Sequence, residues 1–293
     1  MGDYKRKWGD RKDGKWVKDI TGLQAMMTVL FPHRTECEVY LNDIIDVTDL
    51  LKYLEEKNQH SEYKITVMHC IITILAKILR ERPLLNRFVQ GARIYEHNDI
   101  SFSFVAKKQF SDKAEEAIIK LVPKDEDTLY DVAKRIADEV SQVREKEADI
   151  NGLDKIMNSF AKWPRILLII AAKIVLILDY WGKVPGSICK GDPDFSSVLL
   201  SNLGSIKNPA VYHHLNNYGT TSIMFTIGTI HKAEIMMQDG HKEVRDVLDI
   251  GVTLDERIAD GFYFAKSLKL IHYCLEHLQL LDKPIGEPSG FEY

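Results

Sequence analysis

The most regular pattern in the chain is a helical one. Between residues 66 and 82 the large aliphatic side chains recur every three or four positions, which predicts an amphipathic helix with one buried face. We expect this helix to end at Arg82, because the proline that follows pushes this residue out of the α region. A second helix is predicted to start at Thr128, where Thr128 and Asp131 have the spacing of a capping box.

Strands are predicted where apolar and polar residues alternate, or where short apolar runs lie between turn-forming residues. Residues 93–95 and 100–105 are expected to form one hairpin. Asp239-Gly240 is expected to turn a second hairpin between residues 235–237 and 243–245. Further strands are predicted at residues 116–122, 197–205, 222–228 and 247–254.

Residues 166–178 form the most hydrophobic run of the chain, with Lys173 as its one charge. The run is shorter than the roughly 20 residues that a membrane-spanning helix needs, so we expect it not to cross a bilayer. The prediction is a helix buried in the core or in a contact between subunits. The alternative is a helix on a membrane surface, because Trp163, Arg165 and Trp181 flank the run with aromatic and basic side chains.

A strand-to-helix junction carries the strongest candidate chemistry. The strand at residues 247–254 is followed by Asp255-Glu256-Arg257-Ile258-Ala259-Asp260-Gly261, and the periodicity of a helix begins at Phe262. This Asp-x-Arg-x-x-Asp-Gly element resembles the active-site signature of the dihydrolipoyl acyltransferases, the catalytic cores of 2-oxoacid dehydrogenase complexes. Chloramphenicol acetyltransferase has a related signature and the same fold. In both, the general base is a histidine four residues before the aspartate of Asp-Gly, and Glu256 stands at that position here.

Four further segments resemble the same family in the same order along the chain. Pro32-His33-Arg34-Thr35 and Asp46-Val47-Thr48 resemble its Pro-His-x-Thr pattern and the Asp-Val-Thr that leads into a helix. Residues 82–86 resemble its Pro-x-Leu-Asn, and residues 197–205 resemble its strand that ends in Ser-Asn-Leu-Gly. Ser201 matches the family's serine that donates a hydrogen bond to the tetrahedral oxyanion. The resemblance covers roughly residues 31–281 and is greatest to stand-alone bacterial members, which lack lipoyl and subunit-binding domains.

The resemblance implies an α/β fold (α+β, two layers) of the chloramphenicol acetyltransferase type, with a mixed sheet covered by helices. It places residues 21–281 in one acyltransferase-like domain, with an apolar helical insertion at about residues 163–181. A charged arm at residues 1–20 precedes this domain and a tail at residues 282–293 follows it. The resemblance also implies a homotrimer with active sites between subunits, in which Asp260 helps to order the site.

By the same resemblance, the expected reaction is acyl transfer between coenzyme A and a thiol, hydroxyl or amine of a small acceptor. Glu256 would take the acceptor proton as base, and Ser201 would hold the oxyanion. Glutamate is ordinarily a weaker base than histidine by about two pKa units, which adds about 3 kcal/mol to the removal of a thiol proton. The chain is therefore an acyltransferase with a poor or retuned base, or a non-catalytic relative that binds an acyl-CoA or serves as a structural or regulatory trimer.

Composition and charge narrow the remaining function classes. The formal net charge of −4 argues against a nucleic-acid partner, because the one concentrated basic stretch, Lys5-Arg6-Lys7 with Arg11-Lys12, is interleaved with aspartates. Four widely spaced cysteines predict free thiols in a reducing compartment, and the polar N-terminus lacks a signal-peptide core, so we expect a cytoplasmic protein.

The remaining motifs point to no metal and no covalently attached cofactor. His213 and His214 are adjacent, so their side chains point in different directions on a strand, and we expect surface or interface histidines rather than a metal pair. Asp112-Lys113-Ala114 contains the tripeptide found around the lipoylated lysine of lipoyl domains. Here it falls between strands of the expected catalytic domain, so Lys113 is expected to be an ordinary surface lysine without a lipoyl group.

Overall fold

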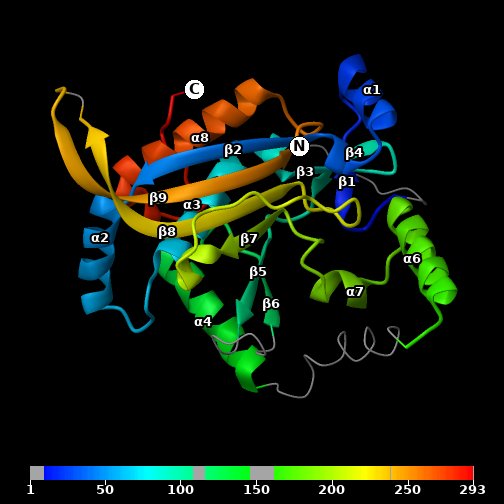
Figure 1. Ribbon diagram of the computed structural model, residues 1–293, viewed down its shortest axis with the longest axis horizontal. Coiled ribbons are helices and arrows are strands. Elements are labelled where there is room, and N and C mark those ends of the chain that lie inside the picture. Colours follow the sequence, from blue (N-terminus) through cyan, green and yellow to red (C-terminus); the bar gives the residue numbers. More distant parts are fainter. Residues whose placement is uncertain (1–9, 108–115, 146–161, 238, 293) are drawn as a thin grey trace.

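The computed structural model describes residues 10–107, 116–145, 162–237 and 239–292 (Figure 1). Its strands are β1 (Gly14–Trp16), β2 (Glu38–Asp46), β3 (Arg87–Gln90), β4 (Arg93–His97), β5 (Phe102–Lys107), β6 (Glu116–Leu121), β7 (Val198–Asn202), β8 (Ile223–Met236) and β9 (Lys242–Asp255). Its α-helices are α1 (Gly22–Leu30), α2 (Thr48–Gln59), α3 (Val67–Glu81), α4 (Leu129–Glu145), α6 (Arg165–Tyr180), α7 (Gly186–Gly191) and α8 (Gly261–Glu276). Short 3-10 helices lie at Arg34–Glu36, Pro83–Asn86, Leu203–Ile206 and Leu278–Asp282.

A six-stranded mixed sheet forms the centre of the fold, in the order β2-β9-β8-β7-β5-β6. β7 runs parallel to both β5 and β8, and the other neighbours are antiparallel. β8 and β9, of 14 residues each, continue beyond their neighbours as a two-stranded ribbon that Figure 1 shows projecting from one end of the sheet. The expected turn at Asp239-Gly240 lies in this ribbon, where Met236 pairs with Lys242.

Helices cover one face of this sheet and form the core with it. On β8, Ile223, Phe225 and Ile227 belong to the buried cluster, because alternate residues of a strand point to the same face. α3 lies against this face with an almost continuous run of buried residues, and α4 and α8 supply further members of the same cluster. The expected mixed sheet covered by helices is confirmed.

Most of the predicted elements are present. α3 ends at Glu81, next to Arg82, as the following proline requires. At the start of α4, Asp131 Oδ2 accepts a hydrogen bond from the backbone N–H of Thr128 at 2.9 Å, as the capping-box spacing predicts. The strands expected around residues 116–122, 197–205, 222–228 and 247–254 correspond to β6, β7, β8 and β9.

The expected hairpin between residues 93–95 and 100–105 is wrong. β4 pairs with β1 and β3 in a separate three-stranded sheet, whereas β5 pairs with β6 and β7 in the large one. The connection between them is tied to the large sheet, because the backbone N–H of Ser101 donates to Ser197 Oγ at 3.1 Å. Alternation along a strand shows which residues share a face, but the partner strand depends on contacts far away in the sequence.

The second face of the large sheet is crossed by an irregular segment at residues 207–222, which we call the crossing segment. Two glycines let this segment lie directly on the strands, because a Cβ atom on Gly228 would be 2.5 Å from the backbone nitrogen of Ala210. A Cβ atom on Gly251 would be 3.0 Å from the carbonyl oxygen of Val211. The face on which the crossing segment lies also carries the polar side chains of β7, β8 and β9.

The expected burial of residues 166–178 in the core is wrong, whereas their burial in a contact between subunits stays a prediction. These residues form α6, but Ile166 is 71% exposed and Ile177 is 59% exposed. The body of the protein holds the end of the helix rather than its length, because Asp179 is fully buried and accepts a hydrogen bond from the backbone N–H of Gly219 at 2.9 Å. Among the described residues, no helix is long and apolar enough to cross a membrane.

The two ends of the described chain lie against the body. β1 adds an edge strand to the small sheet, with Trp16 opposite Tyr95. At the other end Ile285 is buried, and its backbone N–H donates to the carbonyl of Asp127 at 2.9 Å. The tail expected at residues 282–293 therefore packs against the body at Ile285. The four cysteines are free, as predicted.

Candidate active site

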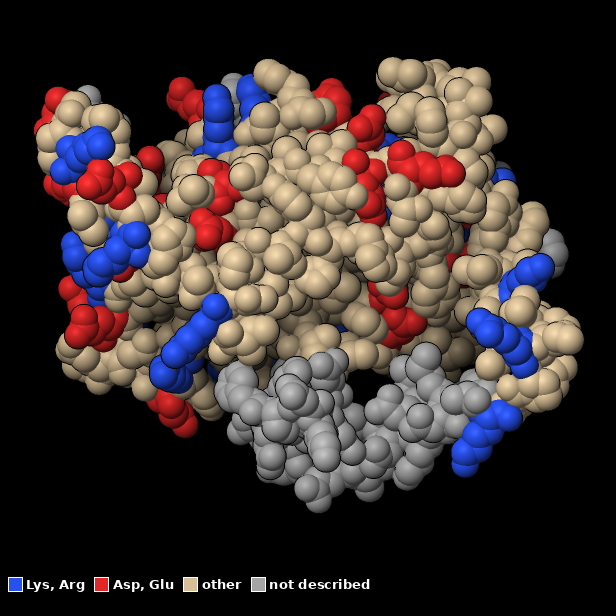
Figure 2. Space-filling model, in the orientation of Figure 1, with Lys and Arg blue, Asp and Glu red and all other residues tan. Residues whose placement is uncertain are grey.

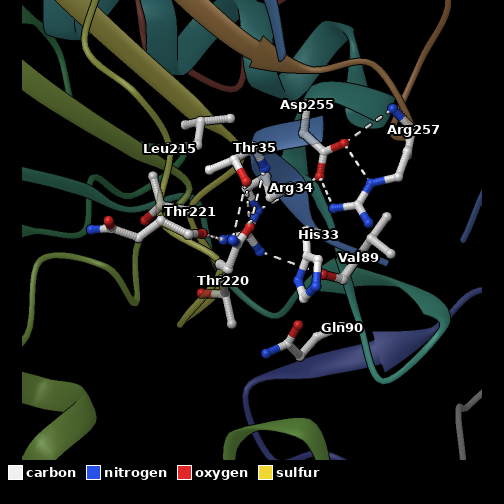
Figure 3. Close-up of polar contacts among 12 residues, drawn as sticks. His33, Arg34, Thr35, Val89, Gln90, Leu215, Thr220, Thr221, Asp255 and Arg257 are labelled. Carbon is white, nitrogen blue, oxygen red and sulfur yellow. Dashed lines mark hydrogen bonds and ion pairs between the residues drawn. The ribbon is translucent and has the colours of Figure 1, made fainter. Parts of the chain in front are cut away.

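The signature at the end of β9 is organised by a buried ion pair (Figure 3). Asp255 and Arg257 are both buried, and Arg257 donates to the two carboxylate oxygens of Asp255 at 2.8 and 2.6 Å. Arg257 also donates to the carbonyls of Phe31 and Pro32 at 2.9 and 3.2 Å. The ion pair thus joins the turn after β9 to the segment before β2.

Arg34 is the third member of this cluster. Its guanidinium lies 3.6 Å from Asp255 and donates to the carbonyls of Tyr218 and Gly219 at 3.3 and 3.2 Å, and also to that of Asn216 (Figure 3). Burial lowers the pKa of Arg34, and the carboxylate of Asp255 opposes that shift. Arg34 therefore connects the signature to the crossing segment, and two arginines share one buried carboxylate.

Glu256 lies between these two buried partners in the sequence, but its own side chain is exposed. Its backbone N–H donates to the carbonyl of Cys37 at 2.9 Å, which sets the direction of the turn. The residue lines a cavity of about 450 Å³. The other walls of this cavity come from α1, β2 and α8 and include Thr21, Gln24, Met27, Val39, Asp260 and Phe264.

Asp260 caps α8 at the edge of the same cavity. Its Oδ1 accepts a hydrogen bond from the backbone N–H of Tyr263 at 2.8 Å, and its backbone is extended, as an N-cap requires. The side chain is exposed. The structure thus places Glu256 and Asp260 at one cavity, and Asp260 acts there as the N-cap of α8.

Ser201 lies near the end of β7, and its neighbour on β8 is Thr226. Thr226 is fully buried, and its hydroxyl has no hydrogen-bond partner within the described part of the chain. Paired residues of adjacent strands have their side chains on the same face, so Ser201 and Thr226 form a pair of hydroxyl groups. This face is the one that carries the crossing segment.

The structure does not bring Ser201 and Glu256 together within one chain. Ser201 is level with Thr226, which pairs with Gly251 on β9. From Gly251 to Glu256 the chain advances by about 17 Å, at about 3.4 Å per residue of an extended strand. A group that reacts with both side chains at once therefore needs Ser201 from one subunit and Glu256 from another.

Sequence reasoning missed two contributors to this region. Arg34 belongs to a family-like motif for which the sequence predicts no role, and its position gives no sign that it would meet Asp255, which lies 221 residues later in the chain. Thr226 lies within the strand predicted at residues 222–228, and the sequence predicts no role for it. Its alternation with apolar Phe225 and Ile227 is the signal that could have placed it on the polar face.

The remaining candidates take no part in this site. His213 has a buried Nε2 atom without a hydrogen-bond partner in the described part of the chain, while the side chain of the adjacent His214 is exposed, so the two point in different directions. The described residues contain no group of three or more His, Cys, Asp or Glu side chains that could hold a metal ion. Lys113 lies outside the described residues.

The mixed sheet, the helices on one face and the Asp-x-Arg junction define the chloramphenicol acetyltransferase class of fold. Comparison with known proteins supports this class of fold. Residues 23–154 match the family model of the 2-oxoacid dehydrogenases acyltransferase (catalytic domain). Over these residues the chain is similar to this family.

One relative and two solved structures illustrate the similarity. The lipoamide acyltransferase component of the branched-chain alpha-keto acid dehydrogenase complex of Bacillus subtilis is 22% identical over 238 residues, which cover 80% of this chain and 45% of that protein. A probable dihydrolipoamide acetyltransferase of Listeria monocytogenes superposes with a TM-score of 0.55 at 19% identity, over 90% of this chain and 96% of the other. Chloramphenicol acetyltransferase superposes with a TM-score of 0.53 at 12% identity, over 89% and 99%. The chain thus spans about half the length of the curated relative, and the structural matches show the fold.

Proposed function

We propose that this protein is an acyltransferase that moves an acyl group between coenzyme A and the thiol, hydroxyl or amine of a small acceptor. The observation that carries the proposal is the position of Glu256. It occupies the place of the family's base, next to the buried Asp255–Arg257 ion pair, and faces a cavity of about 450 Å³. The family match of residues 23–154 supports the same class of reaction.

In this proposal Glu256 is the base. Its carboxylate makes no hydrogen bond or ion pair within the described residues, so its lone pairs are available to a substrate. The carboxylate takes the proton of the acceptor as the acceptor attacks the thioester carbonyl. Closure of a second subunit over the cavity would remove water from Glu256 and raise its basicity, because burial disfavours a charged carboxylate.

Ser201 is the proposed oxyanion donor. Its hydroxyl would donate a hydrogen bond to the oxygen that becomes negatively charged when the tetrahedral species forms. Collapse of that species breaks the bond to the sulfur of coenzyme A, which leaves as the thiol after taking the proton from Glu256. Because Ser201 and Glu256 of one chain lie far apart, the proposal includes a homotrimer in which neighbouring subunits build each site. Neither a lipoyl group on this chain nor a metal has a role in it.

The test measures release of coenzyme A from acetyl-CoA and longer acyl-CoA substrates with a panel of thiols, alcohols and amines. The expected result is turnover by wild type and a loss of about a hundredfold or more in kcat for Glu256→Ala. Glu62→Ala changes an exposed glutamate at a distance from the cavity and is the matched control. Equal rates for wild type, Glu256→Ala and buffer would overturn the proposal.

The second candidate is a non-catalytic relative that binds an acyl-CoA or serves as a structural or regulatory trimer. The exposure of Glu256 favours it, because the single chain offers no burial that would strengthen a glutamate as a base. Glu256→His separates the two candidates. Acyl transfer by this variant combined with calorimetric binding of acyl-CoA to an inactive wild type would establish the second candidate. Turnover by wild type would exclude it.

A further inference from the structure

The exposed surface of α6 contains a continuous apolar stripe. Leu167, Ile170, Ile174 and Ile177 follow one another at steps of three and four residues and therefore lie along one side of the helix. Trp181, the residue after the helix, continues the series. Their exposed fractions are 47, 49, 51, 59 and 60%, respectively. We call this set the α6 stripe.

Another side of α6 is less exposed. Leu168, Ala171, Val175 and Leu178 are half-buried and also recur at steps of three and four residues. The C-terminal end is fixed by the buried Asp179, which binds Arg11 at 3.1 Å. The C-terminal end of α6 is therefore held to the body, and the described residues leave the α6 stripe exposed.

The exposed charged residues in and beside α6 are all basic. Lys162, Arg165, Lys173 and Lys183 lie in or beside it, and none of them forms an ion pair within the described residues. The one acidic residue of the helix is Asp179, which is buried. In Figure 2 the region of α6, at the right edge, shows blue side chains over tan ones and no red ones.

Lys173 lies beside the α6 stripe rather than within it. At about 100° per helical residue, Lys173 is about 80° from the centre of the α6 stripe, and the half-buried residues are about 100° away on the other side. Arg165, the first residue of the helix, is about 160° from that centre. A lysine in that position can extend its stem along apolar neighbours and place its ammonium group in a more polar layer.

We propose that α6 is a monotopic anchor that lies in the plane of an anionic lipid bilayer. The α6 stripe would enter the boundary between headgroups and acyl chains, and Lys173 beside it would bind lipid phosphates. The other basic residues around α6 would add a general attraction to the anionic surface. Trp163 and Trp181 at the two ends suit the same boundary, where tryptophan is enriched. A two-fold contact between copies through α6 would instead place Lys173 near its own copy, because such a contact uses the same patch twice. The inference does not depend on the proposed acyl transfer.

The first test is flotation of the whole protein with vesicles of phosphatidylcholine alone or mixed with phosphatidylglycerol. We expect flotation with the anionic vesicles and little with the neutral ones. Lys162→Gln, Arg165→Gln and Lys173→Gln combined should weaken the partition by about a hundredfold, at about fivefold per basic residue. The matched control replaces the exposed Lys64, Lys134 and Lys269, which lie on other elements, by glutamine and should float like wild type.

The second test removes the α6 stripe. Ile170→Ser with Ile174→Ser should abolish flotation, whereas Met236→Ser with Val244→Ser, which changes equally exposed side chains on the β8–β9 ribbon, should not. Quenching of Trp163 and Trp181 by brominated lipids should accompany binding. No flotation of wild type with anionic vesicles at low salt would overturn the proposal. So would a self-association, measured by sedimentation without lipid, that Ile170→Ser with Ile174→Ser abolishes.

Discussion

The buried carboxylate of Asp255 forms ion pairs with two buried arginines. Its carboxylate lies 2.6 Å from Arg257 and 3.6 Å from Arg34, and all three side chains are almost fully buried. A buried ion pair of this kind contributes little net stability compared with apolar side chains, but it is costly to break because the remaining charges stay buried without compensation. The same pair sets the turn that presents Glu256.

We therefore predict that Asp255→Asn lowers the free energy of unfolding by about 3 to 5 kcal/mol. Urea unfolding followed by circular dichroism measures the change. Glu234→Gln breaks an ion pair with Lys242 in which both side chains are more than half exposed, and it should cost less than about 1 kcal/mol. Similar losses for the two variants would show that burial of Asp255 does not have the stated consequence.

A second prediction at this scale concerns His97 and acid. Burial lowers the pKa of His97 to about 4, below its ordinary 6.5. The centroid of its ring lies 4.6 Å from that of the Phe88 ring, and Nε2 lies 3.2 Å from the carbonyl oxygen of Thr220. Because the folded state binds the proton less readily than the unfolded state, the stability from this residue is present above pH 6.5 and is lost as the pH falls toward 4.

The measurement is urea unfolding at a series of pH values from neutral to acidic. His97→Gln should show a smaller loss of unfolding free energy between pH 6.5 and 4 than wild type does, because the titrating group is gone. The exposed His60, replaced by glutamine, serves as the control and should leave the pH dependence of wild type unchanged. If His97→Gln follows the wild-type curve throughout, His97 is not a source of the acid sensitivity.

Among the elements, α8 begins at the signature itself. Asp260 is its N-cap, and the cap bond to the N–H of Tyr263 is 2.8 Å long. Asp260→Ala should therefore lower the unfolding free energy by about 1 kcal/mol, and Asp260→Asn should lower it much less, because asparagine also caps helices. Measuring the activity of both variants separates the roles. If Asp260→Asn keeps both stability and turnover while Asp260→Ala loses both, the role of Asp260 is to cap α8.

The crossing segment depends on close backbone contact with β8. A Cβ atom on Gly228 would lie 2.5 Å from the backbone nitrogen of Ala210 and 3.0 Å from the carbonyl of Asp249. Gly228→Ala should therefore displace the segment and cost about 1 to 3 kcal/mol, as overpacking does elsewhere. Gly22→Ala is the control, because a Cβ atom there meets nothing within 4 Å. Unchanged thermal unfolding of Gly228→Ala would contradict the contact.

For the whole molecule, the separation of Ser201 from Glu256 gives a sharp test of the proposed shared site. Ser201→Ala and Glu256→Ala should each be inactive alone. When the two variants are unfolded together and refolded as mixed trimers, some interfaces receive both wild-type residues, one from each subunit. Random assortment in a cyclic trimer predicts about a quarter of the wild-type turnover.

Two results would contradict the shared site. One is mixed trimers that remain inactive although separately tagged subunits copurify. The other is a stable monomer in sedimentation at micromolar concentration, because a monomer has no interface at which the two residues can meet.

The sequence alone located several of the helices and strands and indicated the fold. Periodicity located α3, α4 and α8, and the motif from Asp255 to Gly261 identified the fold, because helix periods, caps and turns depend on residues a few positions apart. Only the tertiary structure decided which strand β4 joins, that α6 lies exposed, and that Arg34 meets Asp255. These outcomes depend on contacts between segments far apart in the sequence and on which surfaces the folded body leaves uncovered. No local pattern contains that information.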